Sequence, residues 1–86
     1  MIKRDEIDDP ESCFNKARAD ERLFVLLARD AAAPVAIRAW VKERIRLNKN
    51  VWGDAQIVEA LDCAQRMETE RTAAQRQELL SLGGAA

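Results

Sequence analysis

The side chains that could carry covalent or acid–base chemistry are few and scattered. The two thiols are Cys13 and Cys63, and the two serines are Ser12 and Ser81. The chain contains no histidine, which is the side chain that most often carries protons near neutral pH and binds metals. A Ser-His-Asp or Cys-His site therefore cannot form within one chain.

Metal, phosphate and carboxylate chemistry have little support either. Two cysteines without histidine do not complete a zinc site unless carboxylates or a second subunit supply further ligands. The three glycines are Gly53 and a terminal pair, so no glycine-rich phosphate loop is present. Asp8 and Asp9 could pair as acid and base, but solvation and helix capping explain them as well. The sequence predicts no catalytic residue, no metal site and no cofactor.

A row of cations on one predicted helix is the main candidate for a binding surface. Residues 34–50 hold five basic groups against one acidic group, a balance of +4. Residues 54–71 hold five acidic groups against two basic ones, a balance of −3. The row is either a solvated face balanced by its acidic neighbour or a docking surface for an acidic protein or a phosphate backbone. Its members, at helical spacing, are Arg38, Lys42, Arg46 and Lys49.

The two tryptophans have different expected roles. Trp40 falls on the apolar side of the same predicted helix, so we expect it in the core. Trp52 follows Asn50 in a connector, where it either packs over the end of a bundle or serves as an exposed anchor for a partner. We therefore add Trp52 to the four cations as a candidate partner-binding residue.

The elements that must position these residues begin with a charged arm over residues 1–8. Asp9 is suited to cap a helix over about residues 10–18, with Pro10 at its first position. The apolar side of this helix would bury Cys13, Phe14 and Ala17.

The next element is ambiguous. Asp20 could cap a helix over about residues 20–29, but the apolar run from Leu23 to Ala28 could equally be a buried strand. A lone strand would leave its backbone groups unpaired, and no second strand is evident. The sequence therefore favours a helix here.

The last two helices have the clearest patterns. One is predicted over residues 34–47, with Pro34 near its start and Asn48 near its end. The other begins after Asp54 and runs to about Gln77. Their apolar stripes are Ile37, Trp40, Val41 and Ile45 in the first, and Ile57, Ala60, Leu61, Ala64 and Met67 in the second.

Together these elements predict an all-α fold, a three- to four-helix bundle over residues 9–78 with a frayed tail at residues 79–86. The last helix is longer than such a bundle needs. Its distal half would either fray or pack against a second copy, so a homodimer through this helix is one expectation.

Composition narrows the class of protein. The 86 residues fit one small domain, and 14 basic residues nearly balance 15 acidic ones. The isoelectric point of about 5.4 argues against a general nucleic-acid binder. The longest apolar run is too short to cross a membrane, and the first residues lack the apolar core of a signal peptide. We therefore expect a cytoplasmic protein with reduced thiols and no membrane partner.

Several segments share a pattern with a known group of proteins. The sequence D-P-E-S-C-F-N-K-A at residues 9–17 is followed by D-E-R-L-F-V-L at residues 20–26. Further on come A-R-D, A-P, I-R and a tryptophan, at residues 28–30, 33–34, 37–38 and 40. This pattern resembles short helical proteins of unknown function from bacteriophages and prophages. The match covers about residues 9–64 and departs at Arg22, where the group usually has proline.

The resemblance implies a phage or prophage context and carries over no catalytic residue. Accessory proteins of that context often bind a host protein or assembly, including defence systems. We therefore expect a non-enzymatic interaction protein that acts by stoichiometric binding. The alternative is a small helix-turn-helix-like DNA-binding regulator, with the basic helix in the major groove. Nucleic acid is the less favoured partner because the isoelectric point is low.

Overall fold

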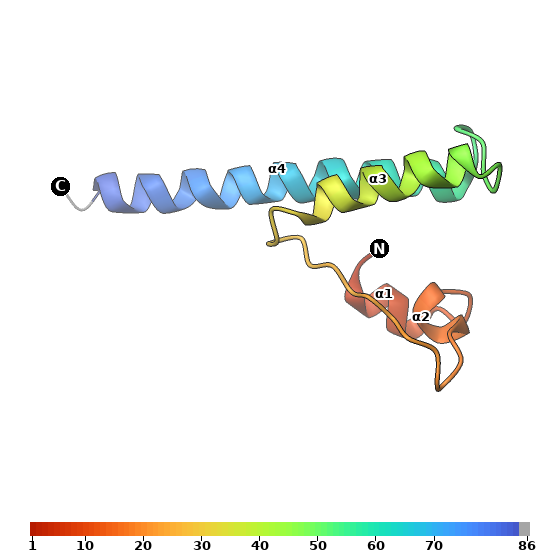
Figure 1. The fold of residues 1–86 in the computed structure, drawn as a ribbon. Coiled ribbons are helices and arrows are strands. Elements are labelled where there is room, and N and C mark those ends of the chain that lie inside the picture. Colours follow the sequence, from red (N-terminus) through yellow and green to blue (C-terminus); the bar gives the residue numbers. More distant parts are fainter. Residues whose placement is uncertain (85–86) are drawn as a thin grey trace.

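The computed structural model describes the backbone of residues 1–84 and the side chains of residues 1–80. Within these residues the only regular elements are helices, so the all-α prediction is confirmed (Figure 1). They are listed in chain order as α1 (Lys3–Asp8), α2 (Cys13–Lys16), α3 (Ala33–Arg46) and α4 (Ala55–Gly84).

The helices do not confirm a three- to four-helix bundle. Helices α3 and α4 form an antiparallel hairpin, and α1 with α2 makes a separate pair beside it (Figure 1). The radius of gyration is 16.2 Å, whereas a compact chain of this length would have about 12 Å. The molecule is accordingly elongated, with principal extents of 53, 29 and 20 Å.

Local signals fix both ends of α3. Pro34 lies in its first turn, and the Asp30 carboxylate accepts the Ala32 N–H at 2.9 Å in the preceding turn. At the other end Asn48 adopts a left-handed φ of 59°. The Asn48 and Lys49 N–H groups then close onto the last carbonyls of the helix, both at 3.0 Å. This is a Schellman cap, and it confirms the helix end predicted at Asn48.

Helix α4 begins after Asp54, as predicted, but the Asp54 carboxylate does not cap it. The Asp54 carbonyl accepts the Val58 N–H at 3.0 Å and so starts the helix. The carboxylate instead accepts the Val51 N–H at 3.0 Å and the Asn50 amide at 2.9 Å. It therefore fixes the connector between the two long helices.

The core of the hairpin is small. Val41, Ile57 and Ala60 form its centre, with Ile37, Ile45 and Leu61 packed against them. Ala33 and Ala64 are also buried. The predicted stripes are thus confirmed except for Met67, which is partly buried outside this cluster, and Trp40, whose side chain is 40% exposed. Trp40 precedes Val41 and so points about 100° away from it around the helix. It therefore lies beside the interface with α4 rather than within it.

Helix α4 continues well beyond α3 (Figure 1). It has 30 residues against 14 in α3, so about 24 Å of helix extends past its neighbour at 1.5 Å per residue. The tail predicted at residues 79–86 is helical as far as Gly84, and residues 85–86 lie outside the described residues. No helix among the described residues is both long and apolar enough to cross a membrane.

The N-terminal region differs most from its predicted structure. The arm expected at residues 1–8 contains α1. The helix expected at residues 10–18 is reduced to α2, and Ser12 caps it rather than Asp9. The predicted burial of Cys13 and Phe14 is wrong, and Ala17 is only partly buried. The reason is that α2 contacts α1 and makes no helix–helix contact with the hairpin.

The helix predicted at residues 20–29 is also wrong. Residues 22–27 form no helix and follow an extended path (Figure 1), and Asp20 lies in a turn before them. In that turn the Glu21 carboxylate accepts the Arg18 N–H at 3.1 Å. Residues 23–27 are apolar at every position, so a helix there would have no polar face for solvent. Phe24 and Val25 also favour extended backbone.

Candidate functional site: an acidic cleft and a basic flank

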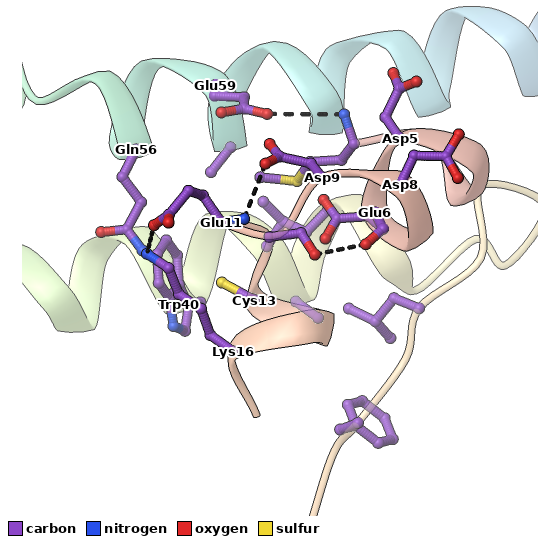
Figure 2. A pocket seen from close by; sticks show the side chains of 17 residues that line it. Asp5, Glu6, Asp8, Asp9, Glu11, Cys13, Lys16, Trp40, Gln56 and Glu59 are labelled. Atoms are coloured by element: carbon purple, nitrogen blue, oxygen red, sulfur yellow. Dashed lines mark hydrogen bonds and ion pairs between the residues drawn. The ribbon is translucent and has the colours of Figure 1, made fainter. Parts of the chain in front are cut away.

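An open cleft lies between the N-terminal region and the hairpin (Figure 2). Its volume is about 1280 Å³. The hairpin supplies an apolar floor of Ala36, Ile37, Trp40 and Ala60, and the extended segment adds Phe24 and Leu26. The cleft therefore offers exposed apolar surface, including an aromatic ring, to a partner.

The rest of the lining is strongly acidic. Six carboxylates line the cleft against two cations, a balance of −4. The amino group of Met1 lies 3.7 Å from Glu59, and Lys16 lies 3.2 Å from Glu11 (Figure 2). Since only two of the acidic groups have an ion-pair partner in the cleft, its potential favours cationic ligands. The six are Asp5, Glu6, Asp8, Asp9, Glu11 and Glu59.

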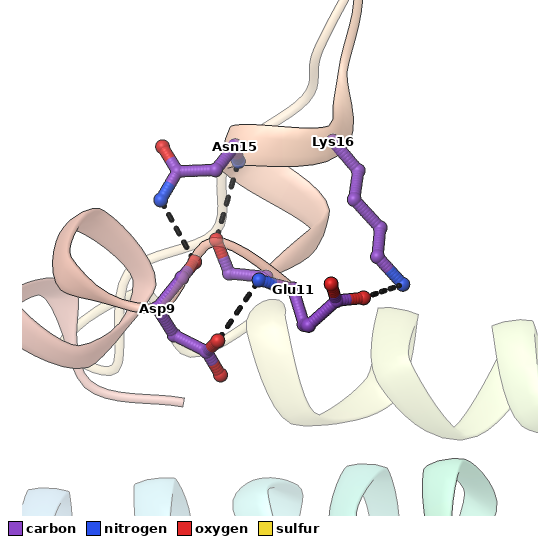
Figure 3. A network of polar contacts seen from close by, with 5 residues as sticks. Asp9, Glu11, Asn15 and Lys16 are labelled. Carbon is purple, nitrogen blue, oxygen red and sulfur yellow. Dashed lines mark hydrogen bonds and ion pairs between the residues drawn. The ribbon is translucent and has the colours of Figure 1, made fainter.

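A polar network shapes the N-terminal wall (Figure 3). The Asn15 amide nitrogen lies 3.0, 2.8 and 2.8 Å from the carbonyl oxygens of Glu6, Ile7 and Asp9. The Ser12 hydroxyl donates to the Glu6 carbonyl at 2.5 Å and accepts the Asn15 N–H at 3.2 Å. These bonds satisfy carbonyls at the end of α1 that have no partner within the helix.

The remaining polar residue of that wall has a structural role too. The Asp9 carboxylate accepts the Glu11 N–H at 2.9 Å and closes the turn between α1 and α2. Asp9, Ser12 and Asn15 all belong to the D-P-E-S-C-F-N-K-A stretch at residues 9–17. In this chain their side chains build the turn and hold α1 against α2.

The two cysteines lie in different regions and are both free thiols. Cys13 is exposed in the cleft wall, whereas Cys63 is partly buried in α4. Burial raises the pKa of the Cys63 thiol above its ordinary value. Over the described residues, no three or more histidine, cysteine or carboxylate side chains are arranged so that they could hold a metal ion.

The predicted cations lie on the opposite flank of α3 from Trp40. Arg38 forms an ion pair with Glu68 of α4, and Arg46 forms one with Glu43 on its own helix. The bond to Arg46 lowers the pKa of Glu43, and the same bond raises the pKa of Arg46. Two of the four cations are therefore neutralised by neighbours. We call this surface the basic flank and define it as Arg38, Lys42, Arg46 and Lys49.

The other two cations are differently placed. Lys42 and Lys49 are exposed, and neither takes part in an ion pair among the described residues. Lys49 follows the Schellman turn and so stands just beyond the end of the helix. The basic flank thus retains two cations that are available to a partner.

The two tryptophans mark separate surfaces. Trp52 is 56% exposed in the connector. Trp40 lies on the cleft floor, with the Arg44 guanidinium 5.6 Å from its ring centroid. The cleft was not predicted from the sequence, although the acidic residues before Ser12 were an available signal.

Comparison of the chain with family models, curated proteins and solved structures found no match.

Proposed function

We propose that the chain is a non-enzymatic interaction protein of phage or prophage type that binds a host protein or assembly stoichiometrically. The observation that carries the proposal is the cleft, in which a partly exposed tryptophan lies on an apolar floor beneath carboxylates. Exposed aromatic anchors of this kind dominate the energetics of protein interfaces.

The chemistry of the cleft indicates the kind of partner. Its floor takes apolar side chains, and its carboxylates attract lysine or arginine at the edges. A segment that is apolar on one side and basic on its flanks satisfies both requirements. Amphipathic helices bind to grooves in this way. We therefore propose a basic, amphipathic segment of a host protein as the ligand.

The basic flank is a second candidate surface because Lys42 and Lys49 are exposed. It would take an acidic protein or a phosphate backbone. A helix-turn-helix would need a helix before α3, and residues 22–27 do not form one. Duplex binding by the flank alone would weaken steeply as salt rises.

The two tryptophans give a matched test of the cleft, since Trp40 lies on its floor and Trp52 is exposed in the connector. A partner captured from a host lysate would be identified and its affinity measured for the wild type, Trp40→Ala and Trp52→Ala. We expect W40A to weaken binding about 30-fold, since a buried aromatic anchor contributes about 2 kcal/mol or more. W52A removes the same side chain from the connector and should change the affinity less than about twofold.

A third variant tests the basic flank without disturbing the hairpin. Arg38 bridges α3 and α4, so Lys42→Glu with Lys49→Glu is the better choice. Full binding by this double variant, together with loss of binding in W40A, supports the cleft. Loss of binding in the double variant with full binding by W40A assigns the partner to the flank instead. Helical circular dichroism confirms that each variant is folded.

A further inference from the structure

The guanidinium group of Arg44 is held at two places. Its central carbon lies 5.6 Å from the centroid of the Trp40 ring, which is within the range of a cation–π interaction. Its Nε–H donates to the side-chain oxygen of Asn50 at 2.6 Å. Among the described residues, Arg44 takes part in none of the ion pairs. Its side chain therefore links the Trp40 ring to the connector between α3 and α4.

The connector fixes the orientation of the Asn50 amide. The amide nitrogen lies 2.9 Å from the Asp54 carboxylate and 3.3 Å from the side-chain oxygen of Gln56. Both of these groups accept hydrogen bonds, so the nitrogen faces them and the oxygen faces Arg44. The reversed amide would present its N–H groups to a guanidinium, which has no acceptor. The Asn50 oxygen is thus a fixed anchor for the guanidinium.

The guanidinium contacts the Trp40 ring from outside the cleft. Trp40 lines the cleft and Arg44 does not, so the part of the ring that faces the cleft is left for a ligand. The Trp40 side chain is 40% exposed, and burial alone therefore does not hold it. Arg44 is half-buried one turn further along α3 and covers the ring from that side.

We infer that Arg44 is a positioning residue for the cleft, because together with Asn50 it holds the Trp40 ring on the cleft floor in the orientation that a ligand meets. The order of the ring is a property of the free chain, whereas its benefit for binding rests on the proposed function. A side chain that is already held in its bound orientation loses less conformational entropy when a ligand binds.

The fluorescence of Trp40 in the free chain tests the positioning. The chain has two tryptophans and no tyrosine, so Trp52→Phe leaves Trp40 as the only strong fluorophore. In this background Arg44→Met should shift the ring about two- to fivefold toward released orientations. The shift is measured as stronger quenching by acrylamide and a red shift of the emission. An unchanged Trp40 signal in R44M overturns the inference.

Arg76→Met is the matched control for the loss of an arginine. Arg76 is exposed on α4, about 24 Å along the helix from Ala60 at 1.5 Å per residue, and Ala60 is the last residue of α4 in the cleft lining. R76M should leave the quenching and the emission of Trp40 unchanged. An equal response in R44M and R76M contradicts the inference.

Two substitutions of Asn50 test the anchor. Asn50→Ala and Asn50→Asp both remove the amide donors to Asp54 and Gln56, but only N50D keeps an oxygen for Arg44. N50A should therefore change the Trp40 signal in the same direction as R44M, and N50D should stay closer to the wild type. Helical circular dichroism confirms that the hairpin is intact. Equal signals from the two variants contradict the part of Asn50.

The consequence for binding is tested with a synthetic amphipathic peptide that carries leucines on one side and lysines on the other. R44M should bind this peptide about two- to fivefold more weakly than the wild type. Loss of a positive charge by itself favours a cationic ligand, so equal or tighter binding by R44M, as expected for R76M, contradicts the role in binding. A wild type that does not bind the peptide contradicts the proposed ligand, and the Trp40 signal of the free chain still decides the positioning.

Discussion

Different interactions stabilise the two regions of the molecule, the N-terminal region at residues 1–32 and the hairpin at residues 33–84. The hairpin of α3 and α4 buries apolar side chains around Val41 and Ile57. The N-terminal region has no buried residue in α1 or α2. It relies on hydrogen bonds from the side chains of Ser12 and Asn15 to the end of α1. Burial and polar bonding thus stabilise the two regions separately.

The difference has consequences for stability and for binding. Apolar burial provides most of the free energy of folding, whereas a typical hydrogen bond adds about 0.5–1.5 kcal/mol net. The N-terminal region should therefore open without unfolding the hairpin. It also forms one wall of the cleft and contains the exposed apolar residues 23–25, so the less stable region carries surfaces for partners.

The largest effect should come from the core of the hairpin. Ile57→Ala removes one of the two largest fully buried side chains and should cost about 2–5 kcal/mol of unfolding free energy. Chemical denaturation followed by helical circular dichroism measures the loss. Val58→Ala is the control on the adjacent exposed position and should stay within about 0.5 kcal/mol of the wild type. Equal losses in both variants would contradict the core assignment.

A smaller effect is expected at the end of α3. Asn48 holds a left-handed φ of 59°, which costs most side chains about 1–2 kcal/mol. Asn48→Ala should therefore lower the unfolding free energy by about 1 kcal/mol. Asn48→Gly should match or exceed the wild type because glycine adopts this conformation freely. If alanine and glycine behave alike in thermal unfolding, the turn does not depend on this conformation.

Asn15→Ala should separate the two regions. It removes a donor that serves three carbonyls at the end of α1. We expect amide exchange in α1 and α2 to accelerate about fivefold, for a loss of about 1 kcal/mol, with no change in α3 and α4. Lys16→Ala is the control, since an exposed ion pair contributes little. Faster exchange of α3 and α4 as well as of α1 and α2 would show that the two regions are coupled.

The smallest predicted effect is a pH dependence in the connector. Bonds from the Asn50 amide and the Val51 N–H lower the pKa of Asp54 in the folded state. Its contribution to stability is therefore present above the ordinary aspartate pKa of about 4 and is lost as the pH falls through the lower folded value. Asp54→Asn should flatten this acid-side loss in thermal unfolding. An unchanged slope would contradict the role of the carboxylate.

The hairpin could be predicted because its signals are local and agree with one another. Pro34, Asn48 and Asp54 mark the helix boundaries, and the apolar spacing of the two stripes identifies the face that packs. Even in the hairpin, two features could not be predicted from the sequence. Arg38 pairs with Glu68, thirty residues away, and the edge position of Trp40 depends on how the two helices pack.

The structure of the N-terminal region could not be predicted because its turns and helices depend on contacts between residues that are several positions apart in the sequence. Asp9 can either cap a helix or close a turn. The side chain of Asn15 bonds to carbonyls up to nine residues earlier, at the end of α1, and these bonds favour the turn. Residues 23–27 are uniformly apolar, so their periodicity does not distinguish helix from strand. The cleft is formed by both regions and so follows from neither one alone.

The central claim is that the hairpin and the N-terminal region are separate units of stability. Residue-resolved amide exchange across low denaturant concentrations, in dilute protein, tests it most directly. We predict that amides at Val41, Ile57 and Ala64 exchange only by global unfolding, with a strong denaturant dependence. Amides of α1 and α2 should exchange by local opening, faster and nearly independent of denaturant. Equal rates with the same denaturant dependence in both regions would contradict the claim.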